Sequence, residues 1–138
     1  MKNPFFTLIA GLLLLLASAN ARSAEVRVEL NKLEAMGDGC GAYLVLGNET
    51  DSAFETLKLD LVMFDTEGIV AKRLAVETAP LGAGKTSLKV FGIDGLPCER
   101  VGRVLLNDVM ACADAAGPRD DCLDLVTPAA RGRVEFIE

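Results

Sequence analysis

The chain has 138 residues with 14 basic and 20 acidic side chains, a net charge of −6, and no histidine. This length suits one domain and excludes two ordinary ones, while the acidic balance disfavours nucleic acids and anionic membrane surfaces as partners. The missing histidine removes the most common metal ligand and the usual general base.

The first residues have a pattern that is typical of an export signal. Lys2 precedes an unbroken apolar run over residues 5–17, and small and polar residues follow up to residue 24. The run is shorter than the roughly 20 residues that a membrane-spanning helix needs. We predict a signal peptide over residues 1–21, with cleavage after Ala24 as the alternative. Residues 22–138 would then form one periplasmic or secreted domain without a stable membrane anchor.

Beyond residue 24, apolar and polar residues alternate with a period of two, which is typical of half-buried β-strands. The expected strands are residues 26–30, 40–46, 57–63, 69–76, 87–93, 101–110, 122–126 and 133–137. The segment 40–46 is apolar on both sides and indicates a central strand. Residues 65–68 predict a hairpin, with Gly68 in the positive-φ position, and residues 127–132 predict a turn.

In the segment 87–93 the alternation has Leu88 and Val90 as its apolar positions, and a slip of phase near Phe91 and Gly92 predicts a bulge. Seven or eight short strands at intervals of roughly ten residues favour an all-β fold. We therefore predict an antiparallel, two-layer, immunoglobulin-like sandwich.

All four cysteines follow the predicted cleavage site, and an even number can pair fully in an oxidising compartment. If successive strands run up and down, the strands near Cys40 and Cys98 start at the same end of the sandwich. Cys112 lies at the far end of the strand that Cys98 precedes, too far for a disulfide, which needs Cα atoms within about 7 Å. We therefore predict the pairs Cys40–Cys98 and Cys112–Cys122.

Residues 79–86 read Ala-Pro-Leu-Gly-Ala-Gly-Lys-Thr, which is similar to a nucleotide-binding P-loop. That loop holds phosphates with the amide groups of a following helix. Residues 87–93 alternate as a strand instead. We interpret the motif as a glycine-rich turn and expect no cofactor.

Other candidate chemical groups are few. Four acids in the irregular segment 111–124 could bind calcium, but they lack the ordered spacing of a calcium loop, so we interpret them as solvated and expect no metal site. Ser52 and Ser87 have no histidine to activate them, which favours a non-catalytic protein over a hydrolase that uses paired carboxylates. Asn48-Glu49-Thr50 is a glycosylation sequon.

The central part of the chain, residues 43–91, resembles the FxLYD-type immunoglobulin-like domains of bacterial envelope proteins. The matching residues are Asn48, Leu57, Leu59, Leu61, Phe64, Asp65, Gly68 and the turn 81–86 before the strand 88–91. Met63-Phe64-Asp65 stands where those domains have Leu-Tyr-Asp, and the cysteines are not part of the pattern. The resemblance implies a β-sandwich with a non-catalytic interaction role and assigns no functional residue.

We therefore expect an exported binding protein of the bacterial periplasm or envelope, with another envelope protein as its partner. The expected contact loops are residues 34–39, 65–68 and 111–121, at one end of the sandwich. The last is preferred, with Asp114, Asp120 and Asp121 as contact residues, because a disulfide-fixed loop loses less entropy on binding. That loop can also be a surface loop that the disulfide merely protects. A small inhibitor or ligand-sequestering protein is the alternative function, and the oligomeric state stays open.

Overall fold

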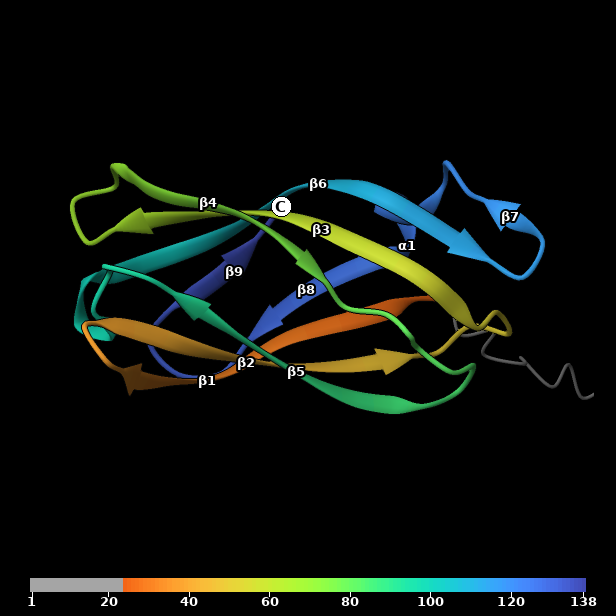
Figure 1. Cartoon of the computed structure of the whole chain (residues 1–138), viewed down its shortest axis with the longest axis horizontal. Coiled ribbons are helices and arrows are strands. Elements are labelled where there is room, and N and C mark those ends of the chain that lie inside the picture. Colours follow the sequence, from red (N-terminus) through yellow and green to blue (C-terminus); the bar gives the residue numbers. More distant parts are fainter. Residues whose placement is uncertain (1–23) are drawn as a thin grey trace, which may run out of the picture.

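The computed structural model describes residues 24–138, and its strands are β1 (Val26–Met36), β2 (Gly39–Asn48), β3 (Phe54–Asp65), β4 (Val70–Glu77), β5 (Thr86–Ile93), β6 (Val101–Asp114), β7 (Gly117–Pro118), β8 (Val126–Ala130) and β9 (Glu135–Ile137). Two short helical turns, η1 (Cys98–Arg100) and α1 (Cys122–Leu125), precede β6 and β8. One sheet has the order β5-β2-β1-β8, and the other has the order β4-β3-β6-β7, with β9 also paired to β6. The two sheets pack face to face (Figure 1). Apart from the two helical turns, the described chain consists of strands and their connections, and it is nearly all β.

The predicted signal peptide, residues 1–21, lies outside the described residues. Within residues 24–138, no helix is both long enough and apolar enough to cross a membrane.

The core lies between the sheets because alternate side chains of each strand point to opposite faces. In β3, Leu57, Leu59, Leu61 and Met63 are all fully buried, as the period of two predicts. The facing sheet adds further apolar side chains, from Val26, Val28, Leu30, Ala42, Leu44 and Leu46. Burial of this apolar surface is the main favourable contribution to folding.

The prediction of a fully antiparallel sandwich is wrong, because each sheet is mixed. β8 pairs with β1 in parallel, and β9 pairs with β6 in parallel. The chain crosses from one sheet to the other through α1 and again through residues 131–134, instead of turning back as hairpins. The expected strand 122–126 is therefore a helical turn followed by the start of β8, and β8 occupies most of the expected turn 127–132.

The apolar Leu88 and Val90 of β5 lie on the outer face of their sheet, whereas Phe91 and Ile93 lie on the core-facing side. Directly opposed residues of an antiparallel pair point to the same side of a sheet, and Leu88 lies opposite Val45 while Val90 lies opposite Tyr43. Leu88 and Val90 are therefore on the outer surface, where they are 62% and 39% exposed. The register between β2 and β5 is continuous, so the bulge expected in this strand is absent.

Two disulfides join Cys40 to Cys98 and Cys112 to Cys122, as the strand directions predicted. Cys40 belongs to β2 of one sheet, and Cys98 lies just before β6 of the other. Cys112 belongs to β6, and Cys122 begins the turn that leads to β8. Each disulfide therefore ties one sheet to a segment that enters the other. Such cross-links are typical of proteins that fold in oxidising, extracytoplasmic compartments.

Candidate functional site

The three loops that we expected as contact surfaces do not share one end of the sandwich. Along the β3–β6 pair, Asp65 lies opposite Val101, whereas Phe54 lies opposite Asp114. The hairpin at residues 65–68 is therefore at the opposite end from the segment 111–121. The expected loop 34–39 is mostly strand, because β1 continues to Met36 and only residues 37 and 38 form the turn.

Arg119 lies in the segment 111–121 and forms ion pairs with two of its three predicted contact acids. Its guanidinium donates two hydrogen bonds to the Asp121 carboxylate, at 2.9 and 2.8 Å, and its Nη1 lies 3.2 Å from an Asp114 oxygen. Nη1 also donates to the Ser52 hydroxyl at 3.1 Å, and the guanidinium lies over the Phe54 ring at 5.4 Å. The hydrogen bonds from Arg119 hold the pKa of Asp121 below its usual value.

The segment is consequently a hairpin with one arginine against three aspartates, in which Asp120 is exposed and unpaired among the described side chains. In the part of the chain that the structure describes, no group of three or more histidine, cysteine or acidic side chains is placed to hold a metal ion. Sequence reasoning missed Arg119, although a single basic residue among four nearby acids was a usable signal.

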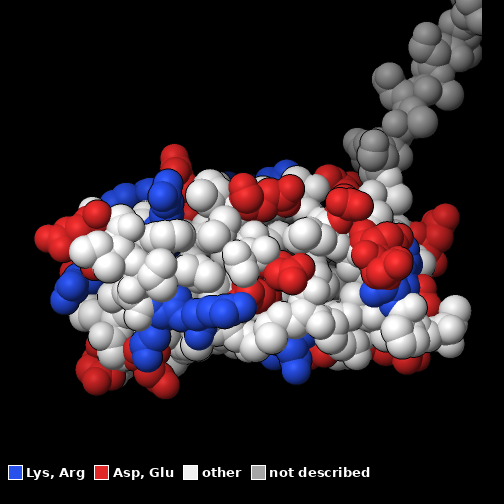
Figure 2. Space-filling model, turned by 90° about the horizontal axis from the view of Figure 1, so that it is seen from above, with Lys and Arg blue, Asp and Glu red and all other residues white. Residues whose placement is uncertain are grey.

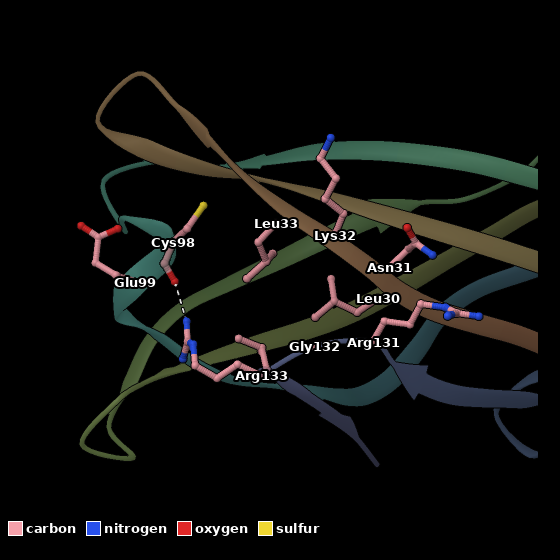
Figure 3. A pocket seen from close by; sticks show the side chains of 10 residues that line it. Leu30, Asn31, Lys32, Leu33, Cys98, Glu99, Arg131, Gly132 and Arg133 are labelled. Atoms are coloured by element: carbon pink, nitrogen blue, oxygen red, sulfur yellow. Dashed lines mark hydrogen bonds between the residues drawn. The ribbon is translucent and has the colours of Figure 1, made fainter.

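A groove of about 490 Å³ opens where the chain leaves one sheet for the other (Figure 3). β8 accompanies β1 only as far as Leu30, so the β1 edge from Asn31 onward is unpaired in the described structure. Leu30, Leu33 and Val134 contribute apolar lining, and Cys98 of η1 lies across the groove. The groove is therefore a half-apolar recess beside an open strand edge.

The basic side chains of the groove already have partners. Arg131 donates from Nε to Glu29 at 2.9 Å, and the Lys32 ammonium lies 2.9 Å from a Glu34 oxygen. Arg133 donates to two main-chain carbonyls of the η1–β6 segment, at 2.9 and 3.1 Å, and one of these bonds is drawn in Figure 3. Arg133 thus fixes the β8–β9 connection, and its charge has no carboxylate partner among residues 24–138.

The outer face of the β5-β2-β1 sheet has a continuous set of apolar side chains, which we call the outer stripe. Its members are Met36, Tyr43, Val45, Leu88 and Val90. Leu88 and Val90 of β5 extend the half-buried Val45 and Tyr43 of β2 towards the edge of the sheet. The Lys32 ammonium lies 4.8 Å from the centre of the Tyr43 ring, at the polar side of the stripe. An apolar centre with a polar rim is typical of protein interaction surfaces.

Met36 joins the outer stripe because two glycines leave room for its side chain. Gly41 of β2 and Gly92 of β5 lie directly opposite each other. A Cβ atom on Gly41 would come within 2.8 Å of the Met36 Cε, and one on Gly92 would lie 3.5 Å from its sulfur. The Met36 thioether therefore rests on the flat surface that the glycine pair forms, and it is 48% exposed.

The glycine-rich segment 79–86 is part of the scaffold. Asn48, which is 1% exposed, donates from Nδ2 to the carbonyls of Ser52, Leu81 and Gly82 at 2.8, 3.3 and 3.1 Å. Its Oδ1 accepts hydrogen bonds from the Thr50 amide and hydroxyl at 3.1 and 2.7 Å. Because β5 follows the segment, it lacks the helix of a P-loop. A glycan on Nδ2 would displace these hydrogen bonds. Asn48 and Thr50 of the sequon therefore stabilise the folded chain in this structure.

The outer face of the other sheet is charged, with both signs interspersed (Figure 2). At its centre, the buried Asp60 accepts two hydrogen bonds from Arg73, both at 2.8 Å, and one from Asn107 at 2.7 Å. The Arg73 and Asn107 bonds lower the pKa of Asp60 to about 2. This network stabilises the β3-β4-β6 face.

Fold and surfaces together define a small, disulfide-bonded, two-sheet β protein with an exposed apolar stripe beside an open edge. No family model matches the chain, and no curated protein matches it. Among solved structures, IrmA from Escherichia coli is similar with a TM-score of 0.59 and 16% sequence identity, over 77% of this chain and 92% of IrmA. At this identity the likeness concerns the fold alone.

Proposed function

We propose that this protein is an exported, non-catalytic interaction protein of the bacterial periplasm or envelope, and that it binds another envelope protein through the outer stripe. The exposure of two apolar side chains on the outer side of β5 is the observation that carries the proposal. Leu88 and Val90 face solvent beside an edge that is unpaired in the described structure, whereas the core-facing side of the same strand has the polar Ser87 and Lys89 before the apolar Phe91 and Ile93. A strand that only closed the core would have polar side chains at positions 88 and 90.

Burial of the stripe against a partner would contribute usefully to affinity. Complete burial of a valine or leucine side chain is worth about 1.5–3 kcal/mol, and Leu88 is still 62% exposed. Leu88 therefore contributes roughly 1–2 kcal/mol when a partner covers it, and Val90, which is 39% exposed, contributes roughly 1 kcal/mol or less. The rigid sheet beneath them keeps the entropy loss small.

The test places a photoreactive amino acid at position 88 of the tagged protein in its native envelope. We expect one saturable adduct with a protein partner. Val90→Thr in the same protein should weaken this adduct, because threonine keeps the strand preference and removes apolar surface.

Position 69 offers a matched control. Ile69 and Val70 are 60% and 59% exposed beside the 65–68 hairpin of the other sheet, so they equal the stripe in exposed apolar character. Photocrosslinking from position 69 should give no specific adduct. The Val70→Thr change should not weaken the adduct that forms from position 88. Equal adducts from both positions, or none from position 88, would overturn the proposal.

We infer further that the sandwich is immunoglobulin-like and of the FxLYD type. The arrangement of β1-β2-β5 opposite β4-β3-β6 supports this inference, since it follows the A-B-E and C-F order of immunoglobulin sheets. The FxLYD assignment rests on the sequence resemblance of residues 43–91.

Ligand sequestration is a second candidate function, and the groove of Figure 3 favours it. Its volume of about 490 Å³ is in the range of small-molecule sites, and both Leu33 and Arg133 line it. An amphipathic carboxylate fits this chemistry. Dodecanoate should raise the melting temperature, and Leu33→Glu should remove the effect while Leu88→Glu leaves it. An equal loss in both variants would contradict a ligand site in the groove.

A further inference from the structure

The two edge strands on one side of the sandwich both have a lysine on the core-facing side. In β5, Lys89 lies opposite the buried Leu44, and in β4, Lys72 lies opposite the buried Met63. Opposed residues in antiparallel pairs share a side of the sheet, so both lysines point to the interior side of their strands. β9 of the second sheet lies against β8, so β4 and β5 are the edges of the opposite, open side.

Neither lysine forms an ion pair with any of residues 24–138. Both are only half-buried, so each ammonium reaches solvent at the open side of the sandwich. The free edge of β5 thus has a distinct chemical pattern. Leu88 and Val90 lie on its outer side, and on its inner side Ser87 and Lys89 precede Phe91 and Ile93.

We propose that the partner supplies an extended segment that adds to β5 as a further strand, and that this segment alternates apolar with acidic side chains. This inference rests on the proposed function, because it specifies what binds at the outer stripe. Main-chain hydrogen bonds to an edge strand provide affinity in this mode of recognition, and alternate side chains provide specificity.

The outer and inner sides of β5 determine which side chains are favoured at alternate positions of the added strand. Side chains of the added strand that point outward would extend the outer stripe beside Leu88 and Val90, which favours apolar residues. Side chains that point inward would lie beside Lys89 and approach Lys72, where a carboxylate gains an ion pair that nothing in the described structure provides. A basic strand would be repelled, and a neutral one would leave the lysines unpaired.

Lysines on edge strands are also a general protection against unwanted pairing. That role and the proposed one differ in what they exclude. Pure protection rejects every strand, whereas the proposed site accepts an acidic one. In one antiparallel register of two β5 strands, Lys89 would face its own copy, so a second molecule of this protein is disfavoured there.

The test uses synthetic seven-residue peptides with blocked ends that alternate valine with glutamate, lysine or serine, titrated against the folded protein. We expect the glutamate peptide to bind at least about tenfold more tightly than the lysine peptide. Amide exchange should slow at alternate residues of β5. N-methylation of one set of alternate peptide residues should abolish binding, and methylation of the other set should not, because only one edge of the peptide pairs.

Lys89→Glu should invert the preference between the glutamate and lysine peptides. Lys58→Glu is the matched control, since Lys58 is also half-buried but lies on the outer side of β3 in the other sheet. Equal binding of all three peptides, or no effect of Lys89→Glu, would overturn the inference and leave the photocrosslinks from position 88 intact. Self-association that protects the β5 amides without peptide would also overturn it, with a second copy as the occupant. Failure of the photocrosslinks alone would remove the proposed function.

Discussion

Asn48 connects three parts of the chain with one side chain. Its amide reaches the 49–53 loop and the glycine-rich segment that precedes β5, so it positions the start of the strand on which the outer stripe depends. Asn48→Ala would remove five hydrogen bonds: the Thr50 amide would lose its acceptor, whereas the Ser52, Leu81 and Gly82 carbonyls would each keep a second donor.

We expect Asn48→Ala to lower the free energy of unfolding by about 3 kcal/mol, because it removes several buried hydrogen bonds worth about 0.5–1.5 kcal/mol each and leaves the Thr50 amide without an acceptor. Urea denaturation would measure the loss. Asn31→Ala is the control: the exposed Asn31 makes one hydrogen bond, to Glu29, so it should cost under about 1 kcal/mol. Similar losses of stability in the two variants would contradict the structural role that we give to the Asn48 hydrogen bonds.

Asp60 makes stability depend on acid pH. Its pKa is lowered from 3.8 to about 2, so the folded state favours the charged form. The contribution is complete above pH 3.8 and disappears as the pH falls through about 2. It amounts to about 2 kcal/mol, since one pKa unit corresponds to about 1.4 kcal/mol.

The check compares wild type with Asp60→Asn, which cannot titrate, in urea at pH 7 and at pH 2. The stability difference between the two proteins should shrink by about 2 kcal/mol at the lower pH. A difference that stays constant would mean that Asp60 has an ordinary pKa in the folded protein.

At the scale of elements, the β6–β7 hairpin depends on Arg119. Arg119→Gln removes the paired hydrogen bonds to Asp121 and the contact with Phe54. We expect a loss of about 1 kcal/mol, since the guanidinium is partly exposed. Amide exchange at residues 113–119 should accelerate. Arg103→Gln, which removes a comparable contact with Phe64 elsewhere, should leave these amides unchanged.

β5 shows what alternation can and cannot predict. The period of two at Leu88 and Val90 predicted a strand, and β5 is a strand. The period does not say which side of the strand meets the core, because polar Lys89 on the inner side escapes to solvent only at a sheet edge. Edge position follows from the order of strands in the sheet, which a single sequence does not state.

The last elements were harder to predict for a related reason. β8 contains Pro128 and three small or polar neighbours, which resemble a turn, and its strand conformation results from parallel pairing with β1. Parallel pairing joins segments that are distant in the sequence, so no local pattern reveals it. The cysteine pairing was predictable because it needed only the directions of β2 and β6.

For the whole molecule, the two disulfides should differ in their effect on stability. Cross-links stabilise by restricting the unfolded chain, more so for longer loops, and the separations are 58 and 10 residues. Replacing both cysteines of Cys40–Cys98 by serine should cost about 4 kcal/mol, against about 3 kcal/mol for Cys112–Cys122. Thermal unfolding of both variants would measure this, with reduced wild type as reference. If the loss of Cys112–Cys122 cost more, then contacts in the folded state, and not restriction of the unfolded chain, would determine how much each disulfide stabilises the protein.

The parallel pairing of β1 with β8 also sets an order of events in time. Val26 pairs with Val126, one hundred residues further along the chain. In a chain that emerges from its amino end, β1 and β2 can meet early, but β1 must wait for almost the whole remaining sequence before its second edge is paired. Closure of the sandwich is then the final step, and until it occurs each new molecule exposes an unfinished strand to its neighbours.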